Sequence, residues 1–457
     1  MIQSINPATG AVIATYEPHS PEEVDAAITG AAQAQARWRK VPVGERVKLL
    51  SSLARELRAG KDRFARLITE EMGKPIIEAA AEIEKCAVTC DFYVEAAPRF
   101  LADETIESNA THSGVVFDPL GVILAIMPWN FPFWQFFRFA APAIAAGNGA
   151  ILKHASNVPG CATEIEALMV RAGCPKGLMR SLLIGSGDVA AIIADDRIAA
   201  VTLTGSTQVG QIVASKAGAA LKKQVLELGG SDPFIVLADA DLEAAAATAV
   251  KSRFVNVGQS CVNAKRFIIE ESVAGRFAEL FKQGISRLKI GDPMDPQTQI
   301  GPMARADLRA ELHDQVERSI AGGAEAVLGA APIEGAGCFY APTLLDKVTP
   351  EHVAFREELF GPVASIIRAR DADHAVALAN DSEYGLGSAI WTTDLERART
   401  LSRAIDAGAV FINGMVASDA RLPFGGIKKS GYGRELGSFG IREFTNIKTI
   451  WIGPAKA

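Results

Sequence analysis

Two side chains in separate segments, Cys261 and Glu227, form a possible pair of nucleophile and base. Cys261 ends the segment GQSC, which would hold the thiol at a turn. A thiolate attacks readily, but only a small fraction of a thiol is ionised near neutral pH unless a base or a dipole assists it. Glu227 is a lone carboxylate at the end of the apolar run VLELGG, where a charge is costly unless it is paired or functional. These residues indicate covalent catalysis by a cysteine; the alternative is that Cys261 is a small buried residue.

Asn130 is a candidate hydrogen-bond donor for the same chemistry. It lies between two prolines in PWNFP (128–132), which fix the backbone around a single amide. The amide NH2 group could donate to an oxygen that becomes negatively charged during the reaction. The alternative is an asparagine that only stabilises a turn.

The segment VTLTGSTQVG (201–210) is the clearest candidate for a phosphate-binding turn. An apolar run leads into Gly205 and is followed by a helical pattern, which places backbone N–H groups, the Ser206 hydroxyl and a helix N-terminus where a diphosphate can bind. The spacing differs from G-x-G-x-x-G and from a P-loop. An ordinary strand-turn-helix connection therefore explains the segment about as well.

Short apolar runs alternate with helical stretches from Leu120 onwards, and they would position these segments. One series comprises VILAIM, AILK, MRSLLIG, AAVTLTG, KQVLELGG and PFIVLAD, and a second comprises KRFIIEE, VASIIRA, GSAIWTT and AGAVFIN. Continuously apolar runs are typical of strands covered on both faces, and helices between them indicate parallel βαβ units. We therefore predict an α/β fold with two doubly wound parallel sheets.

The first hundred residues are predicted to be helical. SPEE (20–23) is typical of a helix start, and Gly60 and Gly73 are predicted to end helices. Cys86 and Cys90 are four residues apart, so one helix face would carry both. No histidine or carboxylate set accompanies them, and none of the six histidines has a metal-ligand spacing, so we predict core packing and no metal site.

Composition and charge argue against several classes of protein. The 457 residues include 47 Lys and Arg and 53 Asp and Glu, which give a net charge of -6 without runs of like charge and disfavour nucleic-acid binding. The apolar segment 120–152 contains prolines, Asn130, Gln135 and Arg138 and does not fit a membrane span. The N-terminus lacks signal-peptide features, and the six cysteines are too scattered for a disulfide framework. We expect a soluble cytoplasmic protein.

Six motifs, in order along the chain, resemble those of the NAD(P)-dependent aldehyde dehydrogenase superfamily: PWNFP, LTGSTQVG, ELGG, GQSC, EELFGPV and PFGGIKKSGYGRE. The resemblance spans nearly the whole chain, beginning with INPATG near the start. Within the superfamily, the stretch from PWNFP to ILKHASN and the segment ASDARLPFGG resemble bacterial succinate-semialdehyde dehydrogenases. The resemblance implies a Rossmann-like cofactor domain, a catalytic domain and a small β-flap.

The resemblance also implies where these parts begin and end. Residues 1–101 and 120–229, with part of 431–446, would form the cofactor-binding domain, and residues 230–430 the catalytic domain. Segments 102–119 and 447–457 would pair to form the flap. In relatives this flap joins subunits, so a homodimer or homotetramer is implied, and the tail NIKTIWIGPAKA suits an edge strand that needs a partner.

The catalytic roles implied by the resemblance agree with the chemistry of the residues. Cys261 matches the nucleophile, Glu227 the general base, and Asn130 the oxyanion donor, joined by the Cys261 backbone N–H. The thiolate would attack the aldehyde carbon, hydride transfer would leave a thioester, and Glu227 would activate the water that hydrolyses it. The presence of all three residues disfavours the alternative of a non-enzymatic descendant.

The implied cofactor site draws on several segments. Its residues are Trp129, Lys153, Ser156, Gly205, Ser206, Gly210, Glu358 and Phe360. Lys153 matches a lysine that holds the adenosine ribose, and Glu358 and Phe360 match residues that contact the nicotinamide ribose and ring. NAD-preferring relatives often carry a glutamate where this chain has Ser156, and a neutral serine beside Lys153 would accept a 2′-phosphate. We therefore expect NADP to be used, with NAD as the alternative.

Arg138 is the sequence feature that bears most on the substrate. Related semialdehyde enzymes have an arginine here that binds the substrate carboxylate, and an arginine among aromatic residues is costly without an anion. Trp134 would line the pocket, and Ser418 would add a hydroxyl donor. One alternative is an ion pair between Arg138 and a carboxylate of the protein. Because Val255 stands where some semialdehyde enzymes have a second arginine, glutarate semialdehyde and uncharged aldehydes remain alternative substrates.

Overall fold

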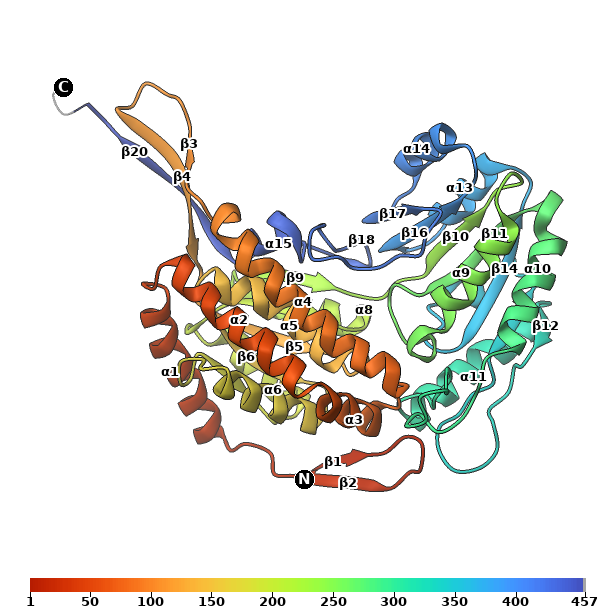
Figure 1. The fold of residues 1–457 in the computed structure, drawn as a ribbon, viewed down its shortest axis with the longest axis horizontal. Helices are drawn as coiled ribbons and strands as arrows, with labels where there is room; N and C mark the ends of the chain where they lie inside the picture. The colour runs from red at the N-terminus through yellow and green to blue at the C-terminus, as the bar shows by residue number, and fades with distance from the viewer. Residues whose placement is uncertain (455–457) are drawn as a thin grey trace.

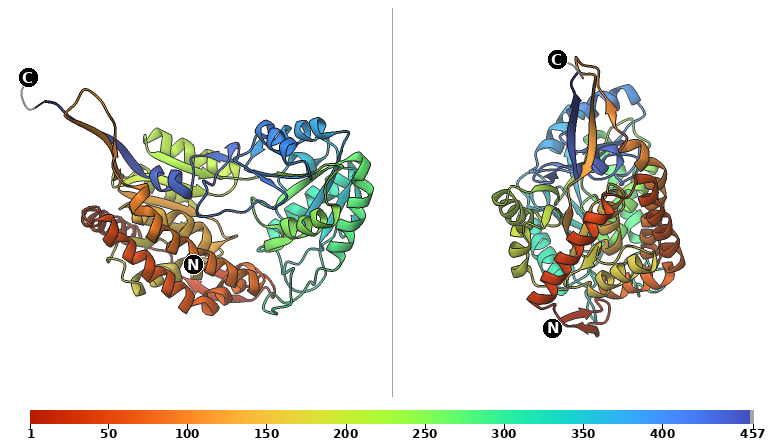
Figure 2. Two further views of the ribbon diagram at one scale, coloured as in Figure 1. Left: turned by 45° about the horizontal axis from the view of Figure 1, so that its top comes forward. Right: turned by 90° about the vertical axis from the view of Figure 1, so that its left-hand side faces the viewer.

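The computed structural model describes residues 1–454, which form two α/β parts and a projecting flap (Figure 1). The flap extends away from the body in Figure 1 and in the left view of Figure 2. The last three residues of the predicted flap, 455–457, lie outside the described residues. None of the helices in the described range has the length and apolar character needed to cross a membrane.

A six-stranded sheet with the order β19-β9-β8-β5-β6-β7 forms the centre of the first part. Five of its strands are parallel, and β19 pairs antiparallel with β9. The strands are β5 (Val122–Met127), β6 (Gly149–His154), β7 (Met179–Ser181), β8 (Ile198–Thr204), β9 (Lys223–Glu227) and β19 (Gly431–Tyr432). The five parallel strands lie in the predicted apolar runs, so the continuous apolar pattern identified strands that are covered on both faces.

Helices cover both faces of this sheet because side chains along a strand alternate in direction. The odd-numbered residues of β5 pack on one helical layer and the even-numbered residues on the other. The first layer contains α2 (Val43–Ala59), α3 (Lys61–Met72), α4 (Ile76–Phe100), α5 (Pro132–Ala145) and α6 (Pro159–Arg171). The second contains α1 (Pro21–Trp38), the short η1 (Ser186–Asp188), α7 (Val189–Ala194) and α8 (Thr207–Ala219).

The predicted helix signals in the first hundred residues are confirmed from Pro21 onwards, but the helical prediction was wrong for the start of the chain, where Ile2–Ile5 and Val12–Tyr16 form an antiparallel pair of strands. The Ser20 hydroxyl accepts a hydrogen bond from the Glu23 N–H at 3.2 Å, and the Glu23 carboxylate accepts one from the Ser20 N–H at 2.8 Å. This reciprocal pair satisfies two backbone donors at the start of α1. Gly60 follows α2, and Gly73 ends α3 in the left-handed region with a φ of 81°.

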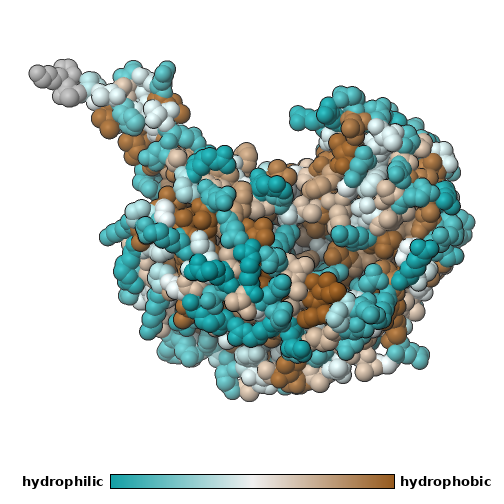
Figure 3. Space-filling view, viewed as in Figure 1, coloured by the Kyte–Doolittle hydropathy of each residue, from teal (hydrophilic) through white to brown (hydrophobic). Residues whose placement is uncertain are grey.

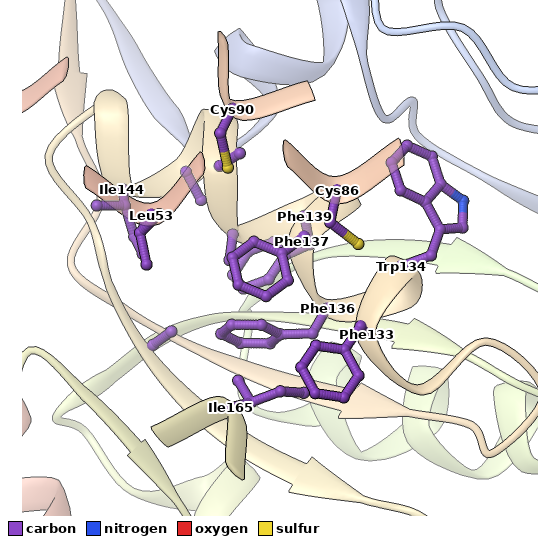
Figure 4. Packing of buried hydrophobic residues seen from close by; sticks show 14 of the residues in the cluster. Leu53, Cys86, Cys90, Phe133, Trp134, Phe136, Phe137, Phe139, Ile144 and Ile165 are labelled. Carbon is purple, nitrogen blue, oxygen red and sulfur yellow. The ribbon is translucent and has the colours of Figure 1, made fainter. Parts of the chain in front are cut away.

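The aromatic segment that could be mistaken for a membrane span is the core of the first part. Every residue of α5 is buried, and Cys86 of α4 is fully buried beside it. Figure 4 shows Phe133, Phe136 and Phe137 packed together in this cluster, with Trp134 at its edge. Each buried phenylalanine contributes roughly 1.5–3 kcal/mol relative to an exposed one. The predicted core role of Cys86 and Cys90 is confirmed.

A seven-stranded sheet with the order β12-β13-β14-β11-β10-β16-β17 forms the second part. Its strands are parallel except β12. They are β10 (Asp232–Val236), β11 (Ala264–Glu270), β12 (Glu325–Leu328), β13 (Thr343–Asp346), β14 (Val363–Ala369), β16 (Gly387–Trp391) and β17 (Ala409–Ile412). Its helices are α9 (Leu242–Phe254), α10 (Glu271–Ser286), α11 (Ala306–Ala321), α12 (Val353–Arg356), α13 (Ala372–Asn380) and α14 (Leu395–Ala404).

The strand predicted from PFIVLAD does not join the first sheet, with which it was grouped. It forms β10 at the centre of the second sheet, between β11 and β16. The chain leaves β9 at Glu227 and crosses to the other part through Leu228, Gly229 and Gly230. The apolar pattern of a buried strand identifies the strand but carries no information about the sheet that it enters.

The remaining strands connect the parts and build the flap. In the flap, β20 (Thr445–Ile452) pairs antiparallel with β4 (His112–Pro119), which also pairs with β3 (Glu104–Thr105). The predicted pairing of the 102–119 region with the C-terminal strand is therefore present. The other short elements are β1 (Ile2–Ile5), β2 (Val12–Tyr16), β15 (Tyr384–Gly385), β18 (Ile427–Lys428) and α15 (Gly437–Glu443).

Candidate active site

The predicted site residues of the first part follow the carboxyl ends of its parallel strands. Asn130 follows β5, Lys153 lies near the end of β6, Gly205 follows β8, and Glu227 ends β9. Carboxyl ends of parallel strands meet at one edge of a sheet, and ligands of open α/β sheets bind outside that edge. The topology therefore brings together residues that are far apart in sequence.

Cys261, the predicted nucleophile, follows a strained turn in the second part. Asn256, Val257 and Gly258 have φ values of 54°, 57° and 72° within the short helix η2 (Val255–Gly258). A left-handed valine is unfavourable because its side chain is branched at Cβ, so surrounding contacts must hold this turn. The Asn256 backbone N–H donates to Glu78 Oε2 at 2.7 Å, and its side-chain amide donates to the Asn130 carbonyl at 2.8 Å. These bonds connect the turn before Cys261 to α4 and to the PWNFP segment.

Lys265 and Gly230 also fix the backbone beside Cys261. The buried Lys265 ammonium donates to the carbonyl oxygens of Ser260 and Cys261, each at 3.0 Å. A Cβ at Gly230 would lie 2.7 Å from the Cys261 carbonyl oxygen, so only glycine permits this approach. At Gly230 the closest neighbouring group is therefore the Cys261 loop of the same chain.

Cys261 lies between two cavities, of about 440 Å³ and about 740 Å³, and lines both of them. The face shown in Figure 3 is hollowed between the two parts of the molecule. A nucleophile shared by two cavities can contact one molecule from each side. The smaller cavity is called the cofactor cavity below and the larger one the substrate cavity.

The cofactor cavity contains many of the predicted cofactor residues. Its lining includes Trp129, Gly205, Ser206, Glu358 and Phe360, together with Asn130. Lys153, Ser156 and Gly210 are not among the lining residues, so their roles in cofactor binding stay predictions. A Cβ at Gly210 would lie 2.5 Å from the Leu228 side chain, which shows that this glycine lets α8 pack closely on the sheet.

The lining of the cofactor cavity fits a dinucleotide. Ser206 caps α8, so the positive end of a 13-residue helix opens into the cavity through Gly205 and Ser206. Such a helix start binds phosphate through its free backbone N–H groups. Glu358 accepts a hydrogen bond from the Gly230 N–H at 3.0 Å and lies 3.4 Å from the Lys265 ammonium, which positions its carboxylate in the lining. The rings of Trp129 and Phe360 meet edge to face with centroids 5.8 Å apart and form an apolar wall.

Asn130 is positioned as a donor beside the nucleophile. Its side-chain amide donates one hydrogen bond to the Gln259 carbonyl at 3.1 Å, which fixes its orientation two residues from Cys261. The amide has a second N–H, and Asn130 and Cys261 both line the cofactor cavity. The arrangement fits the predicted oxyanion donor.

Burial dominates the electrostatics of the two reactive groups. It raises the pKa of the Cys261 thiol to about 12, and nearby Arg138 and Lys265 oppose this shift in part. Burial, followed by repulsion from Glu435, raises the pKa of Glu227 well above its ordinary value. The Cys261 thiol is therefore protonated near neutral pH in this structure, and burial favours the protonated form of Glu227. Glu227 is absent from the linings of the two cavities.

The substrate cavity brings together the three predicted substrate residues, Arg138, Trp134 and Ser418. The Arg138 guanidinium forms a buried ion pair with Glu435 and donates to the Thr204 hydroxyl at 3.2 Å. This pair corresponds to the alternative in which a carboxylate of the protein accounts for the buried arginine. Binding of a substrate carboxylate by Arg138 stays a prediction.

The sequence model of the aldehyde dehydrogenase family matches residues 1–450. The chain belongs to this family. Succinate semialdehyde dehydrogenase Sad of Escherichia coli (strain K12), which is named for NAD(P)+, is 51% identical over 448 residues, covering 98% of this chain and 97% of the relative. A probable NADP+ succinate-semialdehyde dehydrogenase of Synechocystis sp. is 50% identical over 451 residues, covering 99% of each chain.

A solved structure from the family has the same fold. The crystal structure of succinic semialdehyde dehydrogenase from Streptococcus pyogenes, in complex with NADP+, superimposes with a TM-score of 0.97 at 38% identity. The match covers 99% of this chain and 100% of that chain. The predicted fold class is therefore confirmed: two parallel-sheet α/β parts and a β-flap, arranged as in known members of the family.

Several site residues were missed by sequence reasoning. Lys85 lines the substrate cavity, Glu435 pairs with Arg138, Lys265 supports the Cys261 loop, and Glu78 holds the turn before it. Glu435 lies in the quoted motif PFGGIKKSGYGRE, where a lone acid after glycines was an available signal. Lys85 lies in an ordinary amphipathic helix and gave no such signal. Across residues 1–454, no three His, Cys, Asp or Glu side chains are grouped as metal ligands.

Proposed function

We propose that this member of the family oxidises succinate semialdehyde to succinate with NADP+, with NAD+ as an alternative oxidant. The observation that carries the proposal is the position of Cys261 between a cavity that fits a dinucleotide and a cavity that carries positive charge. Lys85 supplies that charge, Arg138 lines the same cavity while paired with Glu435, and Ser418 adds a hydroxyl. The names of the relatives from E. coli, Synechocystis and S. pyogenes support the same substrate and cofactor.

The first half of the reaction uses Cys261 and Asn130. The thiol loses its proton and attacks the aldehyde carbon, and the carbonyl oxygen becomes an anion. The Asn130 amide and the Cys261 backbone N–H stabilise that anion as donors already in place. Loss of hydride from the tetrahedral adduct would leave a thioester on Cys261, and NADP+ would supply the hydride acceptor. Ser206 and the start of α8 would hold its diphosphate, and Glu358 and Phe360 its nicotinamide end.

The second half of the reaction requires Glu227. As a general base, Glu227 takes a proton from water, and the water oxygen attacks the thioester to release succinate. Since Glu227 lines neither cavity and burial favours its protonated form, we infer that it must reorient and be ionised to act as the base in this step. Hydrolysis then returns the Cys261 thiol.

The test is a steady-state comparison of aldehydes with each cofactor. We expect the highest kcat/KM for succinate semialdehyde with NADP+, and we expect Cys261→Ala to abolish NADPH formation while the protein remains folded. Mass spectrometry of quenched reactions is expected to show an acyl adduct on the peptide that contains Cys261. A Cys261→Ala variant with intact turnover would refute the mechanism.

Glutarate semialdehyde is a second candidate substrate because the substrate cavity, at about 740 Å³, has room for one more methylene group. One methylene changes binding by about 1 kcal/mol in a pocket of this kind. A higher kcat/KM for glutarate semialdehyde than for succinate semialdehyde would reassign the substrate. An uncharged aldehyde such as butanal distinguishes a charge preference from a length preference.

We further propose that the chain forms a homodimer or homotetramer through the flap, with the cofactor domain, catalytic domain and flap divided as the sequence predicted. Support comes from β20, which pairs with β4 on one side only and has exposed residues along almost its whole length. An edge strand of this kind presents unpaired backbone groups to a partner.

A further inference from the structure

Lys85 is a cation of the substrate cavity that the mechanism above does not use. It lies on α4 and is half-buried. Its ammonium donates to the Ser418 hydroxyl at 2.6 Å and lies 4.3 Å from the centre of the Trp134 ring. Two of the residues predicted to bind the substrate therefore position Lys85. An ammonium has three donors, so the bond to Ser418 leaves two for a ligand.

The charge of Arg138 is already balanced, whereas that of Lys85 is not. Arg138 pairs with Glu435. In the range 1–454, the contacts of the Lys85 ammonium are the Ser418 hydroxyl and the Trp134 ring, and no carboxylate pairs with it. Of the acids near Lys85, Asp419 pairs with Arg421 at 2.5 Å and Glu82 pairs with Lys74. A partly buried charge without a counter-ion is costly, and a bound anion removes that cost.

We propose that Lys85 is a specificity-determining residue whose ammonium, held by Ser418, binds the carboxylate of the semialdehyde while Cys261 attacks the aldehyde at the other end. This inference deepens the proposed function and rests on it. In this arrangement Arg138 supports the cavity through its pair with Glu435. Lys251 also lines the cavity but is exposed, so Lys85 supplies the partly buried positive charge that selects an anionic substrate. Trp134 packs beneath the ammonium and limits its movement.

Because Lys85 binds a carboxylate only while it is protonated, the inference predicts that the preference for an anionic aldehyde depends on pH. Burial lowers the pKa of Lys85 to about 8, and repulsion from Arg138 acts in the same direction, while Cys86, Glu82 and Asp419 oppose it. The cation is present below this pKa and is lost as the pH rises above it. The substrate carboxylate stays ionised throughout. Glu78 and Lys251 line the same cavity, and burial raises the pKa of Glu78 to about 7, so its ionisation adds negative charge at the start of this range. Preference for an anionic over a neutral aldehyde therefore declines between pH 7 and pH 9.5, and the part due to Lys85 is the part that Lys85→Arg removes.

The experiment measures the ratio of kcat/KM for succinate semialdehyde to kcat/KM for butanal, a neutral aldehyde of the same length. Dividing the two cancels the titration of Cys261 and Glu227, which affects both substrates. At pH 7, Lys85→Met is expected to lower this ratio at least about tenfold, because a charge-assisted hydrogen bond is lost. Lys48→Met is the matched control, since it removes the same charge from an exposed position on α2.

A second variant, Lys85→Arg, tests whether the charge of this residue, and not only its structural role, determines the substrate preference. Arginine stays charged at all accessible pH values. Lys85→Arg is therefore expected to keep the preference for succinate semialdehyde at pH 9.5, where the wild-type enzyme has lost most of it. A ratio in Lys85→Met within about twofold of wild type, or an equal loss in Lys48→Met, overturns the inference and leaves the proposed function intact. A wild-type enzyme that does not prefer succinate semialdehyde over butanal at pH 7 overturns both.

Discussion

At the scale of single residues, Glu227 has the most distinctive environment in the active site. Its carboxyl group is buried, and neither oxygen has a hydrogen-bond partner among residues 1–454. Glu227→Gln keeps the shape of the side chain but removes the base. We expect a pre-steady-state burst of about one NADPH per active site, followed by a steady-state rate at least about 100-fold below wild type, because acylation proceeds and hydrolysis does not. Rapid-mixing absorbance measures both phases.

The same substitution is expected to change the pH dependence of stability. The pKa of Glu227 is raised in the folded state, so the stability that its protonated form contributes is complete below the unfolded-state pKa of about 4.3. It is lost as the pH rises toward the folded-state pKa. Glu227→Gln should therefore gain thermal stability relative to wild type as the pH rises from 5 to 8. Glu334→Gln, on an exposed loop, is the control; equal behaviour of the two variants would contradict the assigned environment.

Sequence predicted the reactive residues better than the residues around them. Cys261 and Asn130 each lie in a motif whose local pattern suggests chemistry, and the structure places both in the cofactor cavity. Lys85 contacts Ser418, and Glu435 pairs with Arg138. In each case the two residues are more than 200 positions apart in the sequence. No local pattern encodes such a pairing, because the fold alone determines which distant side chains meet.

At the scale of elements, the position of α5 depends on a buried acid of α4. Glu82 accepts hydrogen bonds from the Phe133 and Trp134 backbone N–H groups at 2.9 and 3.0 Å, and it pairs with the buried Lys74. It therefore neutralises a buried ammonium and satisfies free donors at the helix start. Because Glu82→Ala leaves the Lys74 charge uncompensated, we expect it to lower the free energy of unfolding by about 3–5 kcal/mol. Urea titration followed by circular dichroism measures the change.

The control for Glu82 lies on the same helix. Glu84 pairs with Arg58 at 2.9 Å on the exposed face of α4. Surface pairs of this kind contribute about 0–1 kcal/mol, so Glu84→Ala should have a small effect. Losses of similar size in the two variants would show that helix propensity, and not the buried ion pair, determines the result.

The elements themselves were largely predictable because their signals are local. The Ser20 cap, the glycines after α2 and α3 and the continuous apolar runs all identified elements that the structure contains. Grouping PFIVLAD with the first series of apolar runs was wrong because the chain crosses to the other part at Gly229 and Gly230, although the domain boundary implied by the family resemblance, between residues 229 and 230, already places this strand in the second part. The antiparallel β12 was not predicted either, since its four residues EAVL show little of the apolar run seen in its neighbours.

At the scale of the whole molecule, the two parts meet at the nucleophile. The cofactor cavity is lined by the carboxyl edge of the first sheet and by Glu358 and Phe360 of the second part. The substrate cavity is lined by α4 and α5 on one side and by the segment around Ser418 on the other. Neither part alone forms either cavity, so catalysis depends on how the two parts pack.

The flap carries the prediction that concerns the assembly. Ile447 and Trp451 of β20 are 60% and 54% exposed, and Figure 3 shows hydrophobic surface along the projecting flap. Exposed apolar side chains on an unpaired edge strand favour pairing with another subunit. We expect the wild-type chain to be a dimer or tetramer by light scattering after size exclusion, and the double variant Ile447→Lys/Trp451→Lys to shift toward monomer. The control is Val12→Lys/Ile13→Lys, which places the same charges on the exposed hairpin strand β2 and should leave the assembly unchanged. A monomeric wild type would exclude β20 as the specific interface, and so would loss of assembly in both double variants.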